Sequence, residues 1–351
     1  MTDLPRIALD AMGGDYAPEA TVAGSLEAIR DLPVRVSLVG PHELVQHELQ
    51  RRLSRGQRGS LTLPPVIDAP EAIAMAEHPV AAVRTKRRSS IVLGVDLVAK
   101  GEADAFVTAG NTGAAMAAAL LGLKRIEGID RPALATPFPT TAGRPCLLLD
   151  VGANADARPH NLVQFAIMGA IYAEQVFGIA SPRVALLSIG EEEEKGSLLV
   201  QEAHRQLRNA PVRFIGNVEG KDIPSGSADV IVTDGFVGNV LIKFAEAAGS
   251  VVLSTIRSEI RANPISSLLA LGLLPAFRRV RKRLDYAEYG GAPLLGVNGV
   301  CIVAHGRSNP RAIRNAVRVA GEAVQGSLVD RIRQGLAALQ LDASAATQAT
   351  P

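Results

Sequence analysis

Short apolar runs that alternate with longer helical patterns are the feature that most constrains the fold of this chain. The predicted strands cover 6–10, 34–39, 104–108, 146–150, 183–189, 212–215, 229–233 and 300–304. The predicted helices cover 17–30, 89–100, 111–125, 160–178, 197–208, 236–261 and 309–335. Apolar strands separated by helices are typical of a largely parallel sheet covered on both faces. The pattern therefore predicts a three-layer α/β/α fold.

The size and composition of the chain fit one large domain of this kind. Its 351 residues are 47% apolar and 21% charged, which is typical of a soluble globular protein with a sizeable core. We predict a single α/β/α catalytic domain over residues 1–340. Residues 341–351 are mostly small and polar, and we expect them to form a flexible tail.

Charge, aromatic content and cysteine usage argue against several classes of function. The net charge is +2, there is no Trp and aromatic residues make up 3%, so no nucleic-acid partner is expected. Cys146 and Cys301 lie in apolar runs without metal-type spacing, which predicts two buried free thiols and no metal site. The N-terminal segment begins a strand, and no unbroken run approaches the ~20 apolar residues that span a bilayer. A cytoplasmic protein is expected.

Polar, glycine-rich loops follow most of the predicted strands. They are DAMGGD (10–15), TAGNTGA (108–114), DVGAN (150–154), IGEEEEKG (189–196), TDGFVGN (233–239) and AHGRSNP (304–310). In parallel sheets, ligands bind beyond the carboxyl ends of the strands. We therefore expect these six loops to line a functional cleft along one edge of the sheet.

Several familiar catalytic motifs are missing from the sequence. The loop after the first strand is not G-x-G-x-x-G, so a dinucleotide cofactor is weakly supported. There is no G-x-S-x-G nucleophile elbow and no H-E-x-x-H zinc motif. Of the scattered histidines, His305 lies on a strand-end loop, where it either acts in the site or bonds its own backbone.

Two of the loops open helices and so present backbone N–H groups. Asn111 and Thr112 precede an alanine-rich helix, whose N-terminus suits an anion such as phosphate, but the same residues also suit an ordinary N-cap. Asn239 stands near the start of the long helix after TDGFVGN. Its side chain either donates an amide N–H into the cleft or completes the turn.

The stretch GEEEEKGS (190–197) keeps the length of a phosphate-binding P-loop but exchanges its glycine and lysine. Four carboxylates would repel a triphosphate, and four consecutive glutamates cannot all face one metal ion. Glutamates near a helix N-terminus are stabilised by the helix dipole. The chemically distinctive residue is Lys195, whose ammonium group can polarise a carbonyl or hold an anion.

A leucine-rich segment near the C-terminal third interrupts the α/β pattern. It predicts a protruding helical hairpin over 259–290 with an apolar elbow and a basic flank at 278–283. The elbow leucines are Leu268, Leu269, Leu271, Leu273 and Leu274. The elbow is too short to span a bilayer, but it suits either the surface of a membrane or a dimer interface.

Taken together, the loops resemble one family. ALDAMGGD, AGNTGA, DVGAN, SIGEEEEKG, FIGNVEG, TDGFVGNV, YGGAPLLG and AHGRSN look like the phosphate acyltransferases of bacterial phospholipid synthesis, in order from residue 6 to about 335. The resemblance implies transfer of a long-chain fatty acyl group from acyl-acyl-carrier-protein to inorganic phosphate. The acyl phosphate product then feeds a membrane-bound glycerol-3-phosphate acyltransferase.

The resemblance also implies a fold, an assembly and a site. The family is similar in fold to phosphotransacetylases and to isocitrate and isopropylmalate dehydrogenases, looks dimeric, and needs no redox cofactor or metal. It implies that Lys195 and Asn239 are catalytic, stabilising the oxyanion or orienting phosphate. As phosphate contacts we select Asn111, Thr112, Gly113, His305 and Ser308.

Finally, the resemblance favours a peripheral association of the hairpin with the inner face of the cell membrane. The basic flank suits either anionic lipid headgroups or the acidic carrier protein, and a second basic cluster at 84–88 also suits the carrier protein. The alternative enzyme is a short-chain phosphotransacetylase that uses acyl-coenzyme A.

Overall fold

The computed structural model describes residues 3–53, 63–263, 270, 272–273, 275–277 and 288–337. Within these residues the chain builds one eleven-stranded sheet in the order β3-β2-β1-β4-β11-β10-β5-β6-β9-β7-β8. The strands are β1 (Arg6–Asp10), β2 (Arg35–Gly40), β3 (Val66–Asp68), β4 (Ala105–Thr108), β5 (Ala133–Phe138), β6 (Cys146–Leu149), β7 (Arg183–Leu187), β8 (Arg213–Val218), β9 (Val230–Val232), β10 (Ala292–Leu295) and β11 (Val300–Val303).

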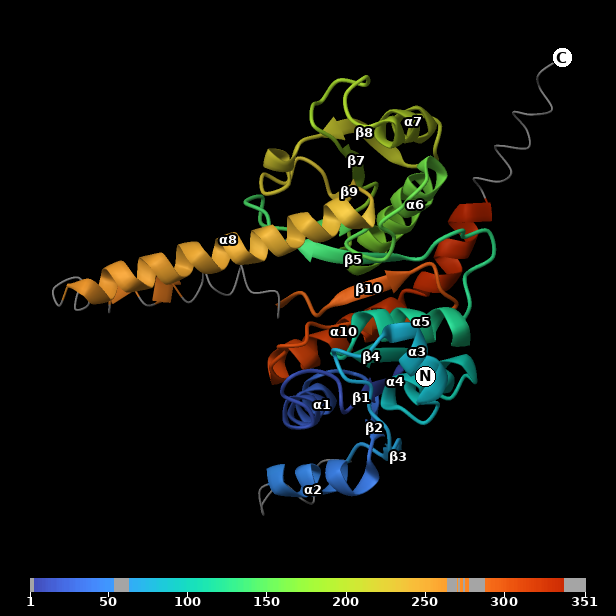
Figure 1. The fold of residues 1–351 in the computed structure, drawn as a ribbon, viewed down its shortest axis with the longest axis vertical. Helices are drawn as coiled ribbons and strands as arrows, with labels where there is room; N and C mark the ends of the chain where they lie inside the picture. Colours follow the sequence, from blue (N-terminus) through green and yellow to red (C-terminus); the bar gives the residue numbers. More distant parts are fainter. Residues whose placement is uncertain are drawn as a thin grey trace.

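Two parallel blocks make up the sheet, joined by a central antiparallel pair. The first block is β3-β2-β1-β4-β11 and the second is β6-β9-β7-β8. Between them, β10 is antiparallel to both β11 and β5, and β5 is antiparallel to β6. The strands of the second block therefore run opposite in sense to those of the first. Figure 1 shows β10 and β5 between the two halves of the molecule.

Helices cover both faces of the sheet. They are α1 (Glu19–Asp31), α2 (His42–Arg52), α3 (Pro79–Thr85), α4 (Ser90–Ala99), α5 (Thr112–Gly122), α6 (Pro159–Val176), α7 (Leu198–Leu207), η1 (Gly220–Asp222), α8 (Gly235–Ala262) and α10 (Pro310–Gln325), and residues 328–337 are also helical. One hydrophobic core lies between the sheet and α1, α2, α6, α7 and α10, and the other between the sheet and α3, α4, α5 and part of α8. Successive strand residues alternate between the two cores: Leu147 and Leu149 join the first, Cys146 and Leu148 the second. The predicted three-layer α/β/α architecture is confirmed.

Local sequence explains where the helices at strand ends begin. Ser89, Asn111, Ser197, Asp234 and Asn309 are N-cap residues whose side chains accept hydrogen bonds from the first turn of α4, α5, α7, α8 and α10. These are the residue types that best satisfy the free N–H groups of a first turn. Because each cap fixes the start of a helix, it also fixes the loop that precedes it.

Several elements differ from the sequence prediction. β5 and β10 were not predicted, and each contains a proline (Pro137 and Pro293), a residue that is uncommon in central strands. β3, α2 and α3 were also not predicted. The helix predicted over 309–335 is wrong as a single helix, since it breaks at Gly326 and Ser327, and Ser327 has a φ of 51°.

α8 leaves the body of the molecule and extends outward (Figure 1). It is long and apolar enough to cross a membrane by length and composition, with a window of mean hydropathy 1.5 of which 6% is buried. The sequence prediction concerned unbroken apolar runs and did not single out this helix, because Lys243 and Glu246 interrupt its apolar run without making the helix polar on average. A mostly exposed apolar helix of this kind is unusual for a chain that stands alone.

The predicted hairpin over 259–290 is described only in part. Its first residues belong to the end of α8, and residues 270, 272–273 and 275–277 are helical. Leu268, Leu269, Leu271, Leu274 and the basic flank at 278–283 lie outside the described residues. Leu273 is described, and 56% of it is exposed.

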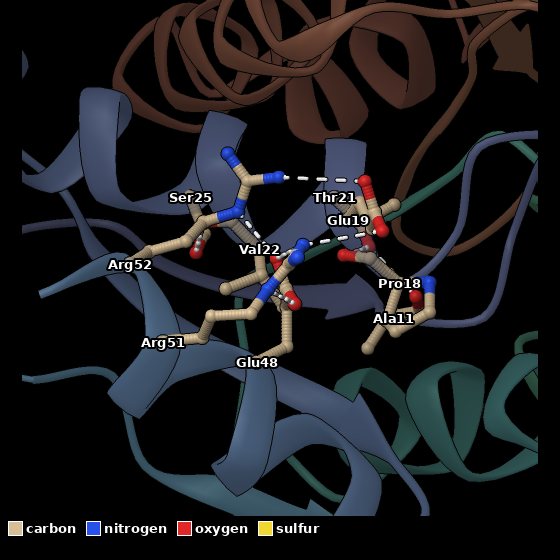
Figure 2. A network of polar contacts seen from close by, with 9 residues as sticks. All are labelled: Ala11, Pro18, Glu19, Thr21, Val22, Ser25, Glu48, Arg51 and Arg52. Atoms are coloured by element: carbon tan, nitrogen blue, oxygen red, sulfur yellow. Dashed lines mark hydrogen bonds and ion pairs between the residues drawn. The ribbon is translucent and has the colours of Figure 1, made fainter.

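A charged cluster joins α2 to the start of α1 in the first block (Figure 2). The carboxylate of Glu48, which is buried, accepts hydrogen bonds from the Nε atoms of both Arg51 and Arg52. The same two guanidinium groups form ion pairs with Glu19 of α1, at 3.1 and 3.8 Å. Burial by itself raises the pKa of Glu48, but the hydrogen bonds from the two arginines outweigh it and the pKa is lowered.

We expect Glu48→Gln to lower the free energy of unfolding by about 1–2 kcal/mol at pH 7, because both guanidinium groups lose a charged acceptor. Since the pKa of Glu48 is lower in the folded state, its stabilisation is complete above the ordinary value of 4.5 and disappears as the pH falls through the folded value. The difference from wild type should therefore shrink between pH 5 and pH 3. Urea unfolding at both pH values measures it. Glu43→Gln, an exposed change on the same helix, is the control, and a pH-independent difference would contradict the account.

Candidate active site

Three glycine-rich loops meet at the end of the second block. β9 lies between β6 and β7 in the sheet, so the loops 150–154, 233–239 and 189–196 that follow these strands are neighbours. The other three loops, 10–15, 108–114 and 304–310, follow β1, β4 and β11 of the first block. The six loops therefore form two groups, one on each parallel block, and not the single row that the sequence predicted, because β10 and β5 reverse the sense of the sheet between the blocks. Lys195 and Asn239 both belong to the second-block group.

A buried carboxylate organises the loop after β6. Asp150 Oδ1 accepts hydrogen bonds from the backbone N–H groups of Leu134, Gly152 and Ala153, and its Oδ2 accepts from the backbone and side-chain amides of Asn154. Burial raises the pKa of Asp150, while these five donors favour the carboxylate. The loop 150–154 is thus wrapped around one side chain and held in a fixed shape.

The first turn of α8 is pressed against this loop. The backbone N–H of Gly235 donates to the carbonyl of Asn154 at 2.8 Å. A Cβ atom on Gly238 would lie 1.9 Å from the carbonyl oxygen of Asp150, so no other residue fits at position 238 without displacing the helix. The glycines of TDGFVGN therefore set the distance between α8 and the loop after β6.

Asn239 is placed by this close packing. It lies in the first turns of α8, and its amide nitrogen is 2.8 Å from the position that a Cβ on Gly152 would take. Gly152 has a φ of 143°, a conformation that glycine adopts without strain. The half-buried amide of Asn239 thus lies directly over the backbone of the loop after β6.

The loop that carries Lys195 closes on itself. A Cβ on Gly190 would lie 3.0 Å from Lys195 Cγ, and a Cβ on Gly196 would lie 2.9 Å from Ser188 Oγ. The side-chain amide of Asn217 donates to the carbonyl of Glu192 at 2.9 Å and anchors the loop to β8. The aliphatic stem of Lys195 therefore rests on Gly190 while the residue as a whole stays exposed.

The four glutamates of this loop are all exposed. Glu193 forms an ion pair with Arg208 at 3.1 Å, on the α7 side of the loop. The side-chain amide of Gln201 donates to the carbonyls of Glu194 and Gly196. The acidic run mainly contributes backbone groups that hold the loop, in agreement with the reading of these residues as scaffold.

A hollow of about 430 Å³ opens beside the second-block loops. Its walls come from residues 155–157, from Leu199 of α7, and from Asp234, Phe236 and Val237 at the start of α8. Leu199 is four residues beyond Lys195, and Val237 is two residues before Asn239. The volume lies within the usual range for small-molecule sites.

A buried aspartate also organises the first-block loops. Asp10 closes β1 and is buried, and its Oδ2 accepts a hydrogen bond from Thr108 Oγ1 at 2.7 Å. Burial raises the pKa of Asp10, and hydrogen bonds from Ser90, Thr108 and the loop backbone oppose the shift. The backbone N–H of Asp15 donates to Gly306, which joins the loops after β1 and β11. Each block thus ends in a buried aspartate that orders its loops.

The predicted phosphate contacts all lie on first-block loops, and their environments differ. Asn111 caps α5, accepting from Ala114 N, and donates to the carbonyls at 74, 75 and 77, so its side chain is occupied within the protein. Gly113 packs against Pro79, where a Cβ would lie 2.6 Å from the ring. His305 Nδ1 accepts from the backbone N–H of Arg307. Ser308 is buried and its hydroxyl has no hydrogen-bond partner in the described residues.

The two cysteines are buried free thiols, as predicted. Burial raises the pKa of both Cys146 and Cys301 to about 12, so neither presents a thiolate at neutral pH. Among the residues that the structure describes, no group of three or more His, Cys, Asp or Glu side chains is placed to hold a metal ion.

Comparison with known proteins identifies the family. Residues 5–331 match the family model described as "Fatty acid synthesis protein". The chain is 55% identical over 329 residues to the phosphate acyltransferase of Heliobacterium modesticaldum, covering 94% of this chain and 97% of that protein. It is 50% identical over 332 residues to the phosphate acyltransferase of Desulfitobacterium hafniense strain DCB-2, again covering 94% and 97%. The chain belongs to the phosphate acyltransferase family. It is an acyltransferase of fatty acid and phospholipid synthesis.

Solved structures show that this acyltransferase shares its fold with other acyl-transferring enzymes. A phosphotransacetylase from Streptococcus pyogenes superimposes with a TM-score of 0.62 at 16% identity, covering 93% of this chain and 95% of that chain. A branched-chain phosphotransacylase from Enterococcus faecalis gives a TM-score of 0.55 at 15% identity, covering 92% and 99%. The predicted phosphotransacetylase-like fold is confirmed.

Sequence reasoning missed three residues that shape the acyltransferase site. Asp150, Asp234 and Gly238 were visible only as parts of glycine-rich loops, and no role was assigned to them. The signal was present, since an aspartate at the end of an apolar strand followed by a glycine within three residues also occurs at Asp10. What the sequence lacked was the information that these loops contact one another.

Proposed function

We propose that this enzyme transfers a long-chain fatty acyl group from acyl-acyl-carrier-protein to inorganic phosphate, giving acyl phosphate and the free carrier protein. Membership of the phosphate acyltransferase family supports the reaction class. The observation that supports the assignment is that Lys195 and Asn239 follow the adjacent strands β7 and β9, each within four residues of a residue that lines the hollow.

In this reaction a phosphate oxygen attacks the carbonyl carbon of the thioester. The carbonyl oxygen becomes an oxyanion, and collapse of the tetrahedral intermediate breaks the C–S bond and expels the phosphopantetheine thiolate. The thiol of this group has an ordinary pKa near 8.5, so the thiolate is a good leaving group and needs only modest help. The reaction requires no Ser or Cys nucleophile, and the high pKa of the two cysteine thiols agrees with this.

Lys195 and Asn239 supply the donors that this intermediate needs. The exposed ammonium of Lys195 can reach the oxyanion or the incoming phosphate, and the amide of Asn239 is already held over Gly152. A hydrogen-bond donor whose position is fixed before the reaction stabilises the transition state by about 3 kcal/mol. The close packing of Gly238 on Asp150 is what fixes the position of Asn239.

For phosphate, we propose contacts from the first-block loops. Thr112, His305 and Ser308 have polar side chains that can bind phosphate. Ser308 is the preferred candidate of the three, because its buried hydroxyl has no hydrogen-bond partner among the described residues. Asn111 and Gly113 act on the shape of the loop through their contacts within the protein. An unchanged KM for phosphate in Ser308→Ala would remove Ser308 from this set.

We also propose a homodimer and a peripheral location at the inner face of the cell membrane. The apolar side chains of Val251, Val252 and Ile256 are exposed along the outer part of α8, and a second copy of this chain would cover them. The hairpin leucines, of which Leu273 is described and exposed, would rest on the membrane surface. This location would deliver the acyl phosphate to a membrane-bound glycerol-3-phosphate acyltransferase.

The donor specificity can be tested with purified protein by following release of the thiol. We expect phosphate-dependent release from palmitoyl-acyl-carrier-protein and at least about tenfold slower release from acetyl-coenzyme A at equal concentrations, since buried methylene groups contribute to binding. Faster turnover of acetyl-coenzyme A would instead identify a short-chain phosphotransacetylase. Thiol release that does not depend on phosphate would point to a hydrolase and contradict the proposal.

A further inference from the structure

Apolar side chains gather around the loop that carries Lys195. Ile189 and Leu198, at either end of the acidic run, are 81% and 85% exposed. A Cβ on Gly196 would lie 2.9 Å from Ser188 Oγ, so the two ends of the loop lie close together. Leu198 adjoins Leu199, which lines the hollow.

The hollow itself combines an apolar lining with two carboxylates. Phe236 and Val237 line it together with Leu199 and residues 155–157. Asp156 and Asp234 also line it, and the Oδ1 atom of Asp234 already accepts two backbone hydrogen bonds at the start of α8. Two carboxylates disfavour a phosphate dianion, so the lining suits an uncharged, apolar part of the substrate.

We propose that this hollow is the subsite for the acyl chain, with the carboxyl-proximal methylene groups against Phe236, Val237 and Leu199 and the chain leaving past Leu198 and Ile189. This inference rests on the proposed function. It adds that the acyl chain and the phosphate bind in separate parts of the site. The acyl chain of the substrate binds beside the second-block loops, next to the thioester carbonyl that Lys195 and Asn239 contact in the proposed mechanism. The phosphate enters from elsewhere, away from Asp156 and Asp234.

The test compares chain-length preference in variants of the full-length enzyme. We expect Phe236→Ser and Val237→Thr to lower the ratio of kcat/KM for palmitoyl- over acetyl-acyl-carrier-protein by at least about fivefold, because an acetyl group has no methylene groups to place in the hollow and one lost methylene contact costs about fourfold in affinity. The rate with acetyl-acyl-carrier-protein should fall much less. Phe244→Ser, a similarly exposed phenylalanine two turns further along α8, should keep the wild-type ratio.

Each other outcome overturns the proposal. If the kcat/KM ratio is unchanged in Phe236→Ser and Val237→Thr, the acyl chain does not bind in the hollow. An equal loss with both substrates assigns these residues to the fold or to an interface between copies. A shift in Phe244→Ser of the same size assigns the effect to the whole face of α8.

A wild-type enzyme without phosphate-dependent thiol release would contradict the proposed function but would not test the acyl-chain subsite. A second measurement tests the subsite in that case. Binding of parinaric acid, a fluorescent long-chain fatty acid, reports on the hollow without turnover. Its affinity should fall at least about fivefold in Phe236→Ser and stay unchanged in Phe244→Ser. Equal affinity in wild type and Phe236→Ser would overturn the subsite.

Discussion

Replacing Lys195 by alanine is expected to lower kcat for acyl transfer by about 100- to 1000-fold. The reason is that the oxyanion of the tetrahedral intermediate loses a charged donor that acts mainly in the transition state. Circular dichroism and the melting temperature should not change, because Lys195 is exposed and its stem rests on glycine backbone. Initial rates of thiol release with palmitoyl-acyl-carrier-protein at saturating phosphate measure the effect.

A matched lysine in the same block serves as the control. Lys221 is exposed on the turn after β8, where it pairs with Glu219 at 3.0 Å, and Lys221→Ala should retain wild-type kcat within about twofold. Asn239→Ala should resemble Lys195→Ala in direction, with a loss of about 100-fold. Wild-type kcat in Lys195→Ala would refute the role assigned to the lysine, and equal losses in both lysine variants would point to a general effect of charge.

The second large effect is expected on stability, at Gly238. A methyl group at this position would collide with the carbonyl oxygen of Asp150 at 1.9 Å, and backbone cannot move aside as a flexible side chain would. We expect Gly238→Ala to lower the free energy of unfolding by about 3 kcal/mol or more, and to lower kcat because α8 carries Asn239. Urea unfolding followed by circular dichroism measures the first effect.

At Gly249, on the same helix, we expect the same substitution to raise the free energy of unfolding. A Cβ at Gly249 would meet no atom within 4 Å, so Gly249→Ala should raise stability by up to about 1 kcal/mol through helix propensity. The same chemical change is thus predicted to have opposite signs at two positions of α8. If Gly238→Ala unfolds within about 0.5 kcal/mol of wild type, the close packing of α8 on the loop after β6 is not present in solution.

Much of the fold follows from local sequence. The apolar runs that form β1, β4, β6, β7, β9 and β11 are buried on both sides, and the polar N-cap residues mark where α5, α7, α8 and α10 begin. The alternation of these elements is sufficient to predict three layers. In contrast, β5 and β10 contain prolines that local rules read as strand breakers, although each proline lies within an antiparallel pairing here.

The candidate site was predictable in its residue types but not in its grouping. Lys195 and Asn239 stand out because a lysine and an amide on strand-end loops carry useful chemistry. That they share one block, while Asn111 and Ser308 belong to the other, depends on the two antiparallel strands at the centre of the sheet. The role of Asn111 also needed three-dimensional information, since its three backbone acceptors come from residues more than 30 positions away.

The identity of the product tests the central claim most directly. Purified enzyme, palmitoyl-acyl-carrier-protein and inorganic phosphate should be mixed and followed by phosphorus NMR, with Lys195→Ala as the matched sample. The account predicts a new acyl phosphate resonance that grows in step with free carrier-protein thiol and is strongly reduced in the variant. Release of thiol together with free palmitate, without that resonance, would contradict it.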